Sequence, residues 1–95
     1  MDYLIRKSSG EIAAELLVMP ALQALLHEEG EKGAQYLETL RIYSEENFNV
    51  TRTAQRLFVH RTSLQDRLNR IRERTGLDLD DPDIRFDLLF SLRLL

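Results

Sequence analysis

The sequence predicts an all-α protein, a small helical bundle that contains a helix-turn-helix motif. Along most of its 95 residues, apolar side chains recur at spacings of three and four, which places them on one face of an α-helix. No segment shows the alternation of apolar and polar residues that is typical of a half-buried strand. Between residues 50 and 75, a short helix, a brief connection and a longer helix follow one another in the order of a helix-turn-helix.

The N-terminal third predicts one or two helices. Residues Glu11–Met19 form a periodic run whose shared apolar face consists of Ile12, Leu16 and Met19. Pro20 interrupts this run, because proline lacks a backbone N–H and its ring clashes with the preceding turn. It either kinks the helix or opens a second helix that continues from Ala21 to about His27.

A polar stretch separates these helices from the next one. Residues 28–33, EEGEKG, contain two glycines and no apolar side chain, which predicts a loop. A helix then fits residues 34–47, with an apolar face made of Tyr36, Leu37, Leu40 and Tyr43. We therefore divide the chain into N-terminal linker helices, residues 1–33, and a helix-turn-helix domain, residues 34–95.

The helix-turn-helix follows from capping and packing requirements. Asn49 is a favoured N-cap residue for a first helix over Val50–Leu57. Its expected buried face includes Ala54, a small residue that permits the close crossing of the second helix, together with Val50 and Leu57. Residues 58–60 form the connection. The second helix covers residues 61–75 and buries Leu64, Leu68 and Ile71.

Stop and start signals define the C-terminal end. Gly76 can adopt the left-handed conformation that ends a helix, and Leu77 and Leu79 in the following loop are expected to fill the core. Asp81 then caps, and Pro82 opens, a last helix that runs to about residue 94. The apolar face of this helix consists of Ile84, Leu88, Leu89 and Leu92.

Charge is distributed unevenly along the chain. The whole chain is acidic, with a formal charge of −3, yet seven arginines lie between Thr51 and Thr75 against only Asp66 and Glu73. A polyanion responds to the local field, so this arginine-rich stretch is compatible with nucleic-acid binding. The chain has no cysteine, which excludes disulfides and thiolate-bound metals. It also has no apolar run long enough to span a membrane, so we expect a soluble, cytoplasmic domain.

One face of the second helix carries residue types that read DNA bases. A helix that enters the major groove is anchored by one apolar face while the opposite face stays free. Arg61 can contact guanine, Gln65 can pair with adenine, and Asp66 can accept a hydrogen bond from cytosine. The predicted base-reading residues are His60, Arg61, Thr62, Gln65, Asp66 and Asn69.

Other polar residues of the motif are better placed for backbone phosphates, which position a protein without specifying sequence. The predicted phosphate contacts are Thr51, Arg52, Ser63, Arg67 and Arg70. These polar residues also have simpler explanations that involve no DNA. An arginine-rich helix face, for example, is often only solvated. Arg72 and Arg74 also complement the negative helix end, and Asp66 is spaced for an ion pair with Arg70.

Several motifs occur in combination: NVTRTA at 49–54, LFVHR at 57–61, RLNRI at 67–71 and TGLDLDDP at 75–82. From Gln35 to Leu95 the sequence thereby resembles the C-terminal helix-turn-helix domain of PucR-type and carbohydrate-diacid (CdaR-like) bacterial transcriptional regulators. The resemblance implies a sequence-specific DNA-binding domain whose recognition helix, residues 61–74, enters the major groove. It also implies a larger N-terminal sensory domain, absent from this chain, that would hold any effector site.

The recognition helix departs from the family pattern, beginning with Thr62, which replaces a usual asparagine. Members commonly read HRNTLRYRL across the recognition helix, whereas this chain reads HRTSLQDRL at 60–68. Gln65 and Asp66 thus replace an Arg-Tyr pair, and because phosphate repels an aspartate, Asp66 either specifies a base or weakens binding. Phe58 stands where many other helix-turn-helix motifs have glycine, although phenylalanine is normal in the family that this sequence resembles, and we expect it to pack under the turn.

The expected partner is double-stranded DNA, bound by a homodimer or a higher oligomer without a cofactor. The alternative is a protein-interaction or oligomerisation module with little DNA affinity of its own. Residues 86–95, FDLLFSLRLL, would then dock a second copy or a sensory domain, although most of these leucines are also expected in the core. An enzyme is not expected, because neither His27 nor His60 has the partners that a nucleophile or a metal site needs.

Overall fold

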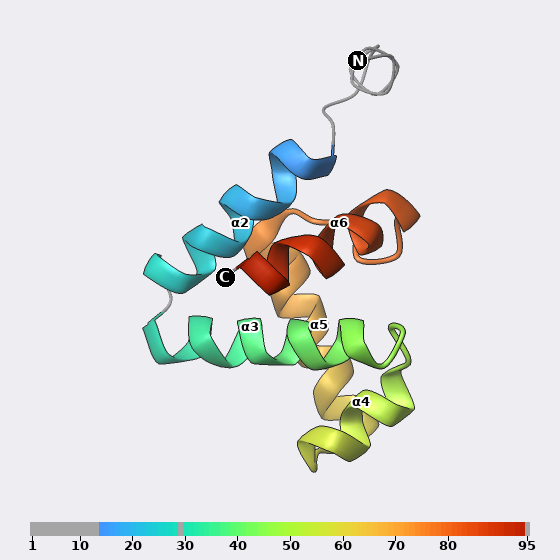
Figure 1. The fold of residues 1–95 in the computed structure, drawn as a ribbon. Helices are drawn as coiled ribbons and strands as arrows, with labels where there is room; N and C mark the ends of the chain where they lie inside the picture. The colour runs from blue at the N-terminus through green and yellow to red at the C-terminus, as the bar shows by residue number, and fades with distance from the viewer. Residues whose placement is uncertain (1–13, 29, 95) are drawn as a thin grey trace.

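The structure, a computed structural model, describes residues 14–28 and 30–94, and within these residues it contains five helices and no strand. The helices are α2 (Ala14–Glu28), α3 (Gly30–Glu45), α4 (Val50–Leu57), α5 (Arg61–Thr75) and α6 (Pro82–Leu94). Figure 1 shows α3 across the middle, with α2 and α6 on one side of it and α4 on the other, while α5 passes behind α3. The prediction of an all-α bundle is confirmed.

Helix α2 is continuous through Pro20, so of the two alternatives for this proline, the second, that it opens a new helix, is wrong. A proline inside a helix costs roughly 3 kcal/mol. Packing on both sides of Pro20 offsets that cost, because Val18, Leu22 and Leu25 are all buried in the core. Met19 is half-buried, so the core face is displaced from the predicted one. Residues 11–13, where the predicted helix begins, and the side chain of Leu16 lie outside what the structure describes.

The predicted loop over residues 28–33 is also wrong, since α2 extends to Glu28 and α3 begins at Gly30. Gly30 has a φ of 59°, a left-handed value that glycine adopts without a steric penalty, so the chain turns between the helices at this point. Glu31 lies in the first turn of α3, where a negative charge complements the positive end of the helix. The helix therefore starts earlier than its apolar pattern predicts.

The C-terminal end of α3 closes in a left-handed turn. The helix ends at Glu45, short of the predicted residue 47, because Asn47 and Phe48 have φ values of 56° and 61°. The backbone N–H of Phe48 donates to the carbonyl of Tyr43 at 2.7 Å, and the two rings meet edge to face at 5.1 Å. The guanidinium of Arg85, from α6, lies 4.8 Å from the centre of the Phe48 ring. This corner, which leads into α4, is thereby fixed to the rest of the bundle.

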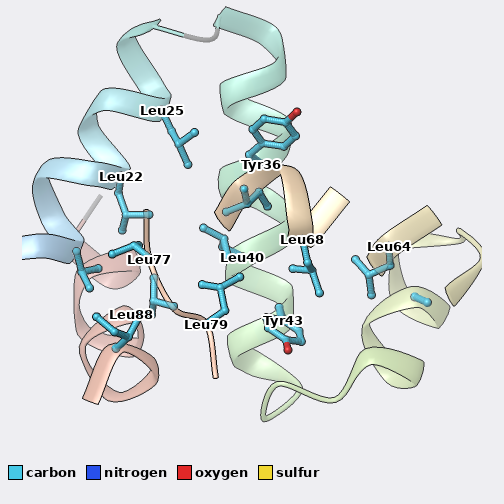
Figure 2. Close-up of a cluster of buried hydrophobic side chains, with 14 residues drawn as sticks. Leu22, Leu25, Tyr36, Leu40, Tyr43, Leu64, Leu68, Leu77, Leu79 and Leu88 are labelled. Atoms are coloured by element: carbon cyan, nitrogen blue, oxygen red, sulfur yellow. The ribbon is translucent and has the colours of Figure 1, made fainter. Parts of the chain in front are cut away.

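One hydrophobic cluster joins all five helices and the loop before α6 (Figure 2). Its buried members are Val18, Leu22, Leu25, Tyr36, Leu40, Tyr43, Ala54, Leu64, Leu68, Ile71, Leu77, Leu79, Ile84 and Leu88. The predicted burial of Leu64, Leu68 and Ile71 in α5 is confirmed, as is that of Leu77 and Leu79 in the loop. Predicted core residues at the edge of the cluster, Leu37, Val50, Leu57 and Leu92, are partly buried. Leu89 was predicted in the core as well, but it is 37% exposed.

Candidate nucleic-acid interface

Helices α4 and α5 form the predicted helix-turn-helix. The Asn49 carboxamide oxygen accepts a hydrogen bond from the backbone N–H of Arg52 at 2.9 Å, which is the predicted N-cap. Thr53 is fully buried, and its hydroxyl donates to the carbonyl of Asn49 at 2.7 Å. Ala54 is buried where α4 packs against α5. The start of α4 is therefore fixed by its cap and by Thr53, and the small side chain of Ala54 lies where α4 packs against α5.

The turn between the two helices is held by its backbone. Phe58 has a φ of 57°, and its N–H donates to the carbonyl of Gln55 at 3.2 Å, while the N–H of Val59 donates to that of Ala54 at 3.0 Å. The Phe58 side chain is 94% exposed, so the prediction that it packs under the turn is wrong. Val59, which is partly buried, packs against the core instead. The backbone of the turn thus takes the glycine-like conformation and turns the phenyl ring toward solvent.

The predicted base-reading face is accessible. Every member of the set is exposed, namely His60, Arg61, Thr62, Gln65, Asp66 and Asn69. Figure 1 shows α4 and the start of α5 together at the end of the bundle away from α2. His60 occupies the N-cap position of α5 without a side-chain cap bond. Asn69 accepts a hydrogen bond from the Arg72 guanidinium at 2.9 Å, one turn further along the helix.

Asp66 does not form the predicted ion pair. Within the part of the chain that the structure describes, no salt bridge joins Asp66 to Arg70, and both side chains are exposed. The simplest explanation for an aspartate in this stretch, a helical ion pair of a few tenths of a kcal/mol, is therefore removed.

One arginine of the stretch is engaged with the acidic end of α3. Arg56 lies 2.9 Å from a carboxylate oxygen of Glu45 and 3.1 Å from one of Glu46. The hydrogen bond from Arg56, with help from Arg41, holds the pKa of Glu45 below its ordinary value. Hydrogen bonds to Glu45 and Glu46 in turn raise the pKa of Arg56. Both sides of the pair stay charged at neutral pH, so Arg56 ties α4 to α3 and its charge is balanced locally.

Two further arginines make contacts within the fold. The guanidinium of Arg67 donates to the hydroxyl of Thr39 at 3.1 Å, and Thr39 is fully buried in α3. Arg72 lies 3.6 Å from a carboxylate oxygen of Asp80, in the loop after α5. Arg67 was predicted as a phosphate contact, whereas the structure places its guanidinium at the junction of α3 and α5.

Three arginines of the stretch are exposed and lack a side-chain partner among the described residues. Arg52 in α4 and both Arg61 and Arg70 in α5 have no side-chain hydrogen bond or ion pair among the described residues. Charges of this kind are available to a polyanion at little internal cost, because no ion pair has to be broken first.

Sequence reasoning missed the contribution of α3 to this surface. An open cleft of about 260 Å³ lies between the two helices, lined by Lys32 and Gln35 from α3 and by Ser63, Asp66 and Arg70 among others from α5. No sequence signal pointed to Lys32, because it falls in the stretch that was predicted to be a loop and lies far from α5 along the chain.

A second surface feature lies on α6. Phe86, Phe90 and Leu94 are 60%, 57% and 78% exposed, and the two phenyl rings contact each other with centroids 5.1 Å apart. The three positions are spaced at i, i+4 and i+8, so the side chains form one apolar stripe along the helix. Large apolar side chains grouped in this way are typical of a contact surface.

The described residues contain neither a cluster of metal-ligating side chains nor a helix that could span a membrane. Within residues 14–28 and 30–94, no group of three metal-ligating side chains gathers at one place. His27 at the end of α2 and His60 before α5 are both exposed and lie on different elements. None of the helices in this part of the chain is both long and apolar enough to cross a bilayer.

Comparison with known proteins gives a consistent result. Residues 36–94 match the family model described as the PucR C-terminal helix-turn-helix domain. The chain is 45% identical over 56 residues to the carbohydrate diacid regulator of Escherichia coli (strain K12), covering 59% of this chain and 14% of that protein. It is 35% identical over 69 residues to the purine catabolism regulatory protein of Bacillus subtilis (strain 168), covering 73% of this chain and 13% of that protein.

A longer match comes from a protein of Streptococcus dysgalactiae subsp. equisimilis named leucine-rich protein, which is 31% identical over 102 residues. That match covers 96% of this chain and 36% of the streptococcal protein. The chain therefore spans between 13% and 36% of the length of these three relatives. No solved structure matches the chain significantly.

Proposed function

The chain belongs to the family of PucR C-terminal helix-turn-helix domains, and from this premise we propose that it is the sequence-specific DNA-binding domain of a bacterial transcriptional regulator. One observation carries the proposal. The start of α5 presents an exposed polar face on a helix whose opposite face is anchored by Leu64, Leu68 and Ile71. This is the arrangement that a recognition helix needs in order to enter the major groove.

The base-reading role falls on the exposed face of α5. Arg61 in the first turn is free to donate two hydrogen bonds to guanine, and Gln65, one turn later, can pair with adenine. Asp66 and Asn69 complete the face with an acceptor for cytosine and a second carboxamide, while His60 and Thr62 flank Arg61. Each good bidentate pair discriminates against the wrong base by about 1–3 kcal/mol.

The phosphate contacts fall on residues beside that face. Arg52 and Thr51 lie in the first turn of α4, and Ser63 and Arg70 lie on α5. Arg67 belongs to the predicted set as well. Because its guanidinium already hydrogen-bonds Thr39, we propose that Arg67 is the weaker phosphate contact.

Two substitutions separate the two roles. Arg61→Ala should reduce affinity for a duplex selected from random sequence much more than affinity for random duplex. Arg52→Ala should weaken both by about the same factor, because a phosphate contact carries no sequence information. Equal losses on the two duplexes for both variants would contradict the assignment.

We further propose that the domain acts in the cytoplasm, without catalytic activity, and that it binds DNA as a homodimer or higher oligomer. Two copies would read half-sites about 34 Å apart, one turn of the duplex. The apolar stripe Phe86, Phe90 and Leu94 is the surface that favours self-association. It also supports the second candidate function, an oligomerisation module with little DNA affinity. Sedimentation of the wild type and of Phe86→Ala/Phe90→Ala, each with and without duplex, separates the two functions.

The boundaries of the DNA-binding unit are part of the proposal. We propose that residues 34–95 contact DNA and that residues 1–33 connect them to the rest of a regulator. Helix α2 shares the core through Val18, Leu22 and Leu25, so this segment also supports the fold of the domain. Because the chain spans a minor part of each relative, we propose that effector recognition lies in the part of those proteins outside the shared segment.

A further inference from the structure

The cleft between α3 and α5 gathers residues that are far apart in sequence. Lys32 and Gln35 belong to the first half of α3, and Ser63, Asp66 and Arg70 lie along one flank of α5 at spacings of three and four. A neighbouring hollow of about 550 Å³ is also lined by Lys32 and Arg70, so the two cations border both hollows beside the recognition helix.

The charges of the cleft favour an anion. Three cations, Lys32, Arg67 and Arg70, line it against the single acid Asp66. Arg67 is committed to Thr39, whereas Lys32 and Arg70 are exposed and form no hydrogen bond or ion pair with other described residues. The hydroxyl of Ser63 and the carboxamide of Gln35 add neutral donors. An ammonium, a guanidinium and neutral donors around one recess are a set that suits a phosphate group.

The cleft lies beside the face of α5 that is proposed to read DNA bases. A helix lying in the major groove is bordered on each side by a sugar-phosphate backbone. The cleft lies on the flank of α5 next to the base-reading face, because Asp66, which lines the cleft, is four residues from Thr62 and three from Asn69 and so adjoins both on the helix surface. A backbone that passed this flank would lie between Arg70 of α5 and Lys32 of α3, which line the cleft from its two helices.

We propose that this cleft seats a backbone phosphate of the DNA that α5 reads, held between Lys32 and Arg70, so that α3 takes part in the interface although it lies outside the helix-turn-helix. The inference rests on the proposed function. Asp66 lines the same cleft, and its negative charge opposes a phosphate there, so the Lys32 charge would offset that repulsion.

The test is the salt dependence of duplex binding by Lys32→Ala and Lys32→Arg, with Arg93→Ala as the matched control. Arg93 is an exposed cation on α6, away from the cleft. Each phosphate contact contributes about 0.9 to the slope of log affinity against log salt. Lys32→Ala should therefore make the salt dependence shallower by about 0.9 in that slope. It should also weaken binding to the selected and the random duplex alike. Lys32→Arg and Arg93→Ala should bind like the wild type.

Three outcomes would overturn the proposal, and they point to different errors. If the wild type binds duplex and Lys32→Ala binds with the same slope, the phosphate seat is wrong and the proposed function stands. If the wild type binds no duplex, the proposed function itself fails. If inorganic phosphate alone shifts the amide resonances of Lys32, Gln35 and Ser63 while Lys32→Ala leaves duplex binding unchanged, the cleft is a site for a free anion and does not belong to the DNA interface.

Discussion

Replacing Arg67 by alanine tests whether this arginine holds α5 against α3. The Arg67 side chain is half-buried, and its guanidinium donates to the buried hydroxyl of Thr39 at 3.1 Å. A hydrogen bond that involves a charged group contributes about 1.5–3 kcal/mol to stability. The hydroxyl of Thr39 still donates to the carbonyl of Gln35 at 2.8 Å, so Arg67→Ala leaves no buried donor unpaired. We therefore expect a loss near the low end of that range, about 1.5 kcal/mol.

The assay is urea unfolding at neutral pH, followed by circular dichroism at the helix band, with the free energy of unfolding extrapolated to water. Arg70→Ala is the matched control, because Arg70 lies on the same helix but is exposed and has no hydrogen bond among the described residues. It should change the free energy of unfolding by less than about 0.5 kcal/mol. Equal stabilities of the two variants would refute the tether between Arg67 and Thr39, and with it the reason for ranking Arg67 as the weaker phosphate contact.

Three other changes test the remaining parts of the fold. Phe58→Gly should leave the free energy of unfolding unchanged or raise it by up to about 1 kcal/mol, because the ring is exposed and glycine removes the left-handed strain; a thermal midpoint several degrees lower would show that the ring packs after all. Asn49→Ala should cost about 1 kcal/mol in urea unfolding, whereas Asn49→Asp should keep the cap, and equal midpoints for the two would contradict the capping role. The lowered pKa of Glu45 stabilises the fold above the ordinary pKa of glutamate, and this contribution disappears as the pH falls through the lowered value. Glu45→Gln should therefore flatten the acid limb of stability against pH, and an unchanged limb would rule out that contribution.

Local signals predicted the C-terminal two thirds of the fold. Asn49, Gly76 and Pro82 each mark a helix end by a requirement of their own backbone or side chain, and all three helix ends lie at the predicted positions. Near α2 the same signals failed, because burial on both sides of Pro20 outweighed the preference of proline for a helix start. Gly30 contributed to the wrong prediction of a loop over residues 28–33. In the structure this one residue, with its left-handed backbone, is enough for the turn between α2 and α3.

The candidate site was predictable where it depends on one helix. The periodicity of α5 separated its buried leucines from its outward face, and that face is exposed as predicted. Contacts between helices were not predictable in the same way. Nothing in the sequence around Arg67 shows that its guanidinium meets Thr39, and nothing around Lys32 shows that it shares a cleft with Arg70. Exposure of Phe58 was missed because the turn was expected to bury its largest side chain.

The most direct test of DNA binding is a titration of the domain against two labelled duplexes, one selected from random sequence and one unselected, between 50 and 200 mM salt. The three exposed arginines without an internal partner (Arg52, Arg61 and Arg70) and the other proposed phosphate contacts predict a linear fall of log affinity with log salt, by about 0.9 for each phosphate contacted. They also predict that the selected duplex binds more tightly at every salt concentration, and that Arg61→Ala removes this preference. Affinity that is independent of salt, or equal for the two duplexes with the wild-type domain, would contradict sequence-specific DNA binding by this chain.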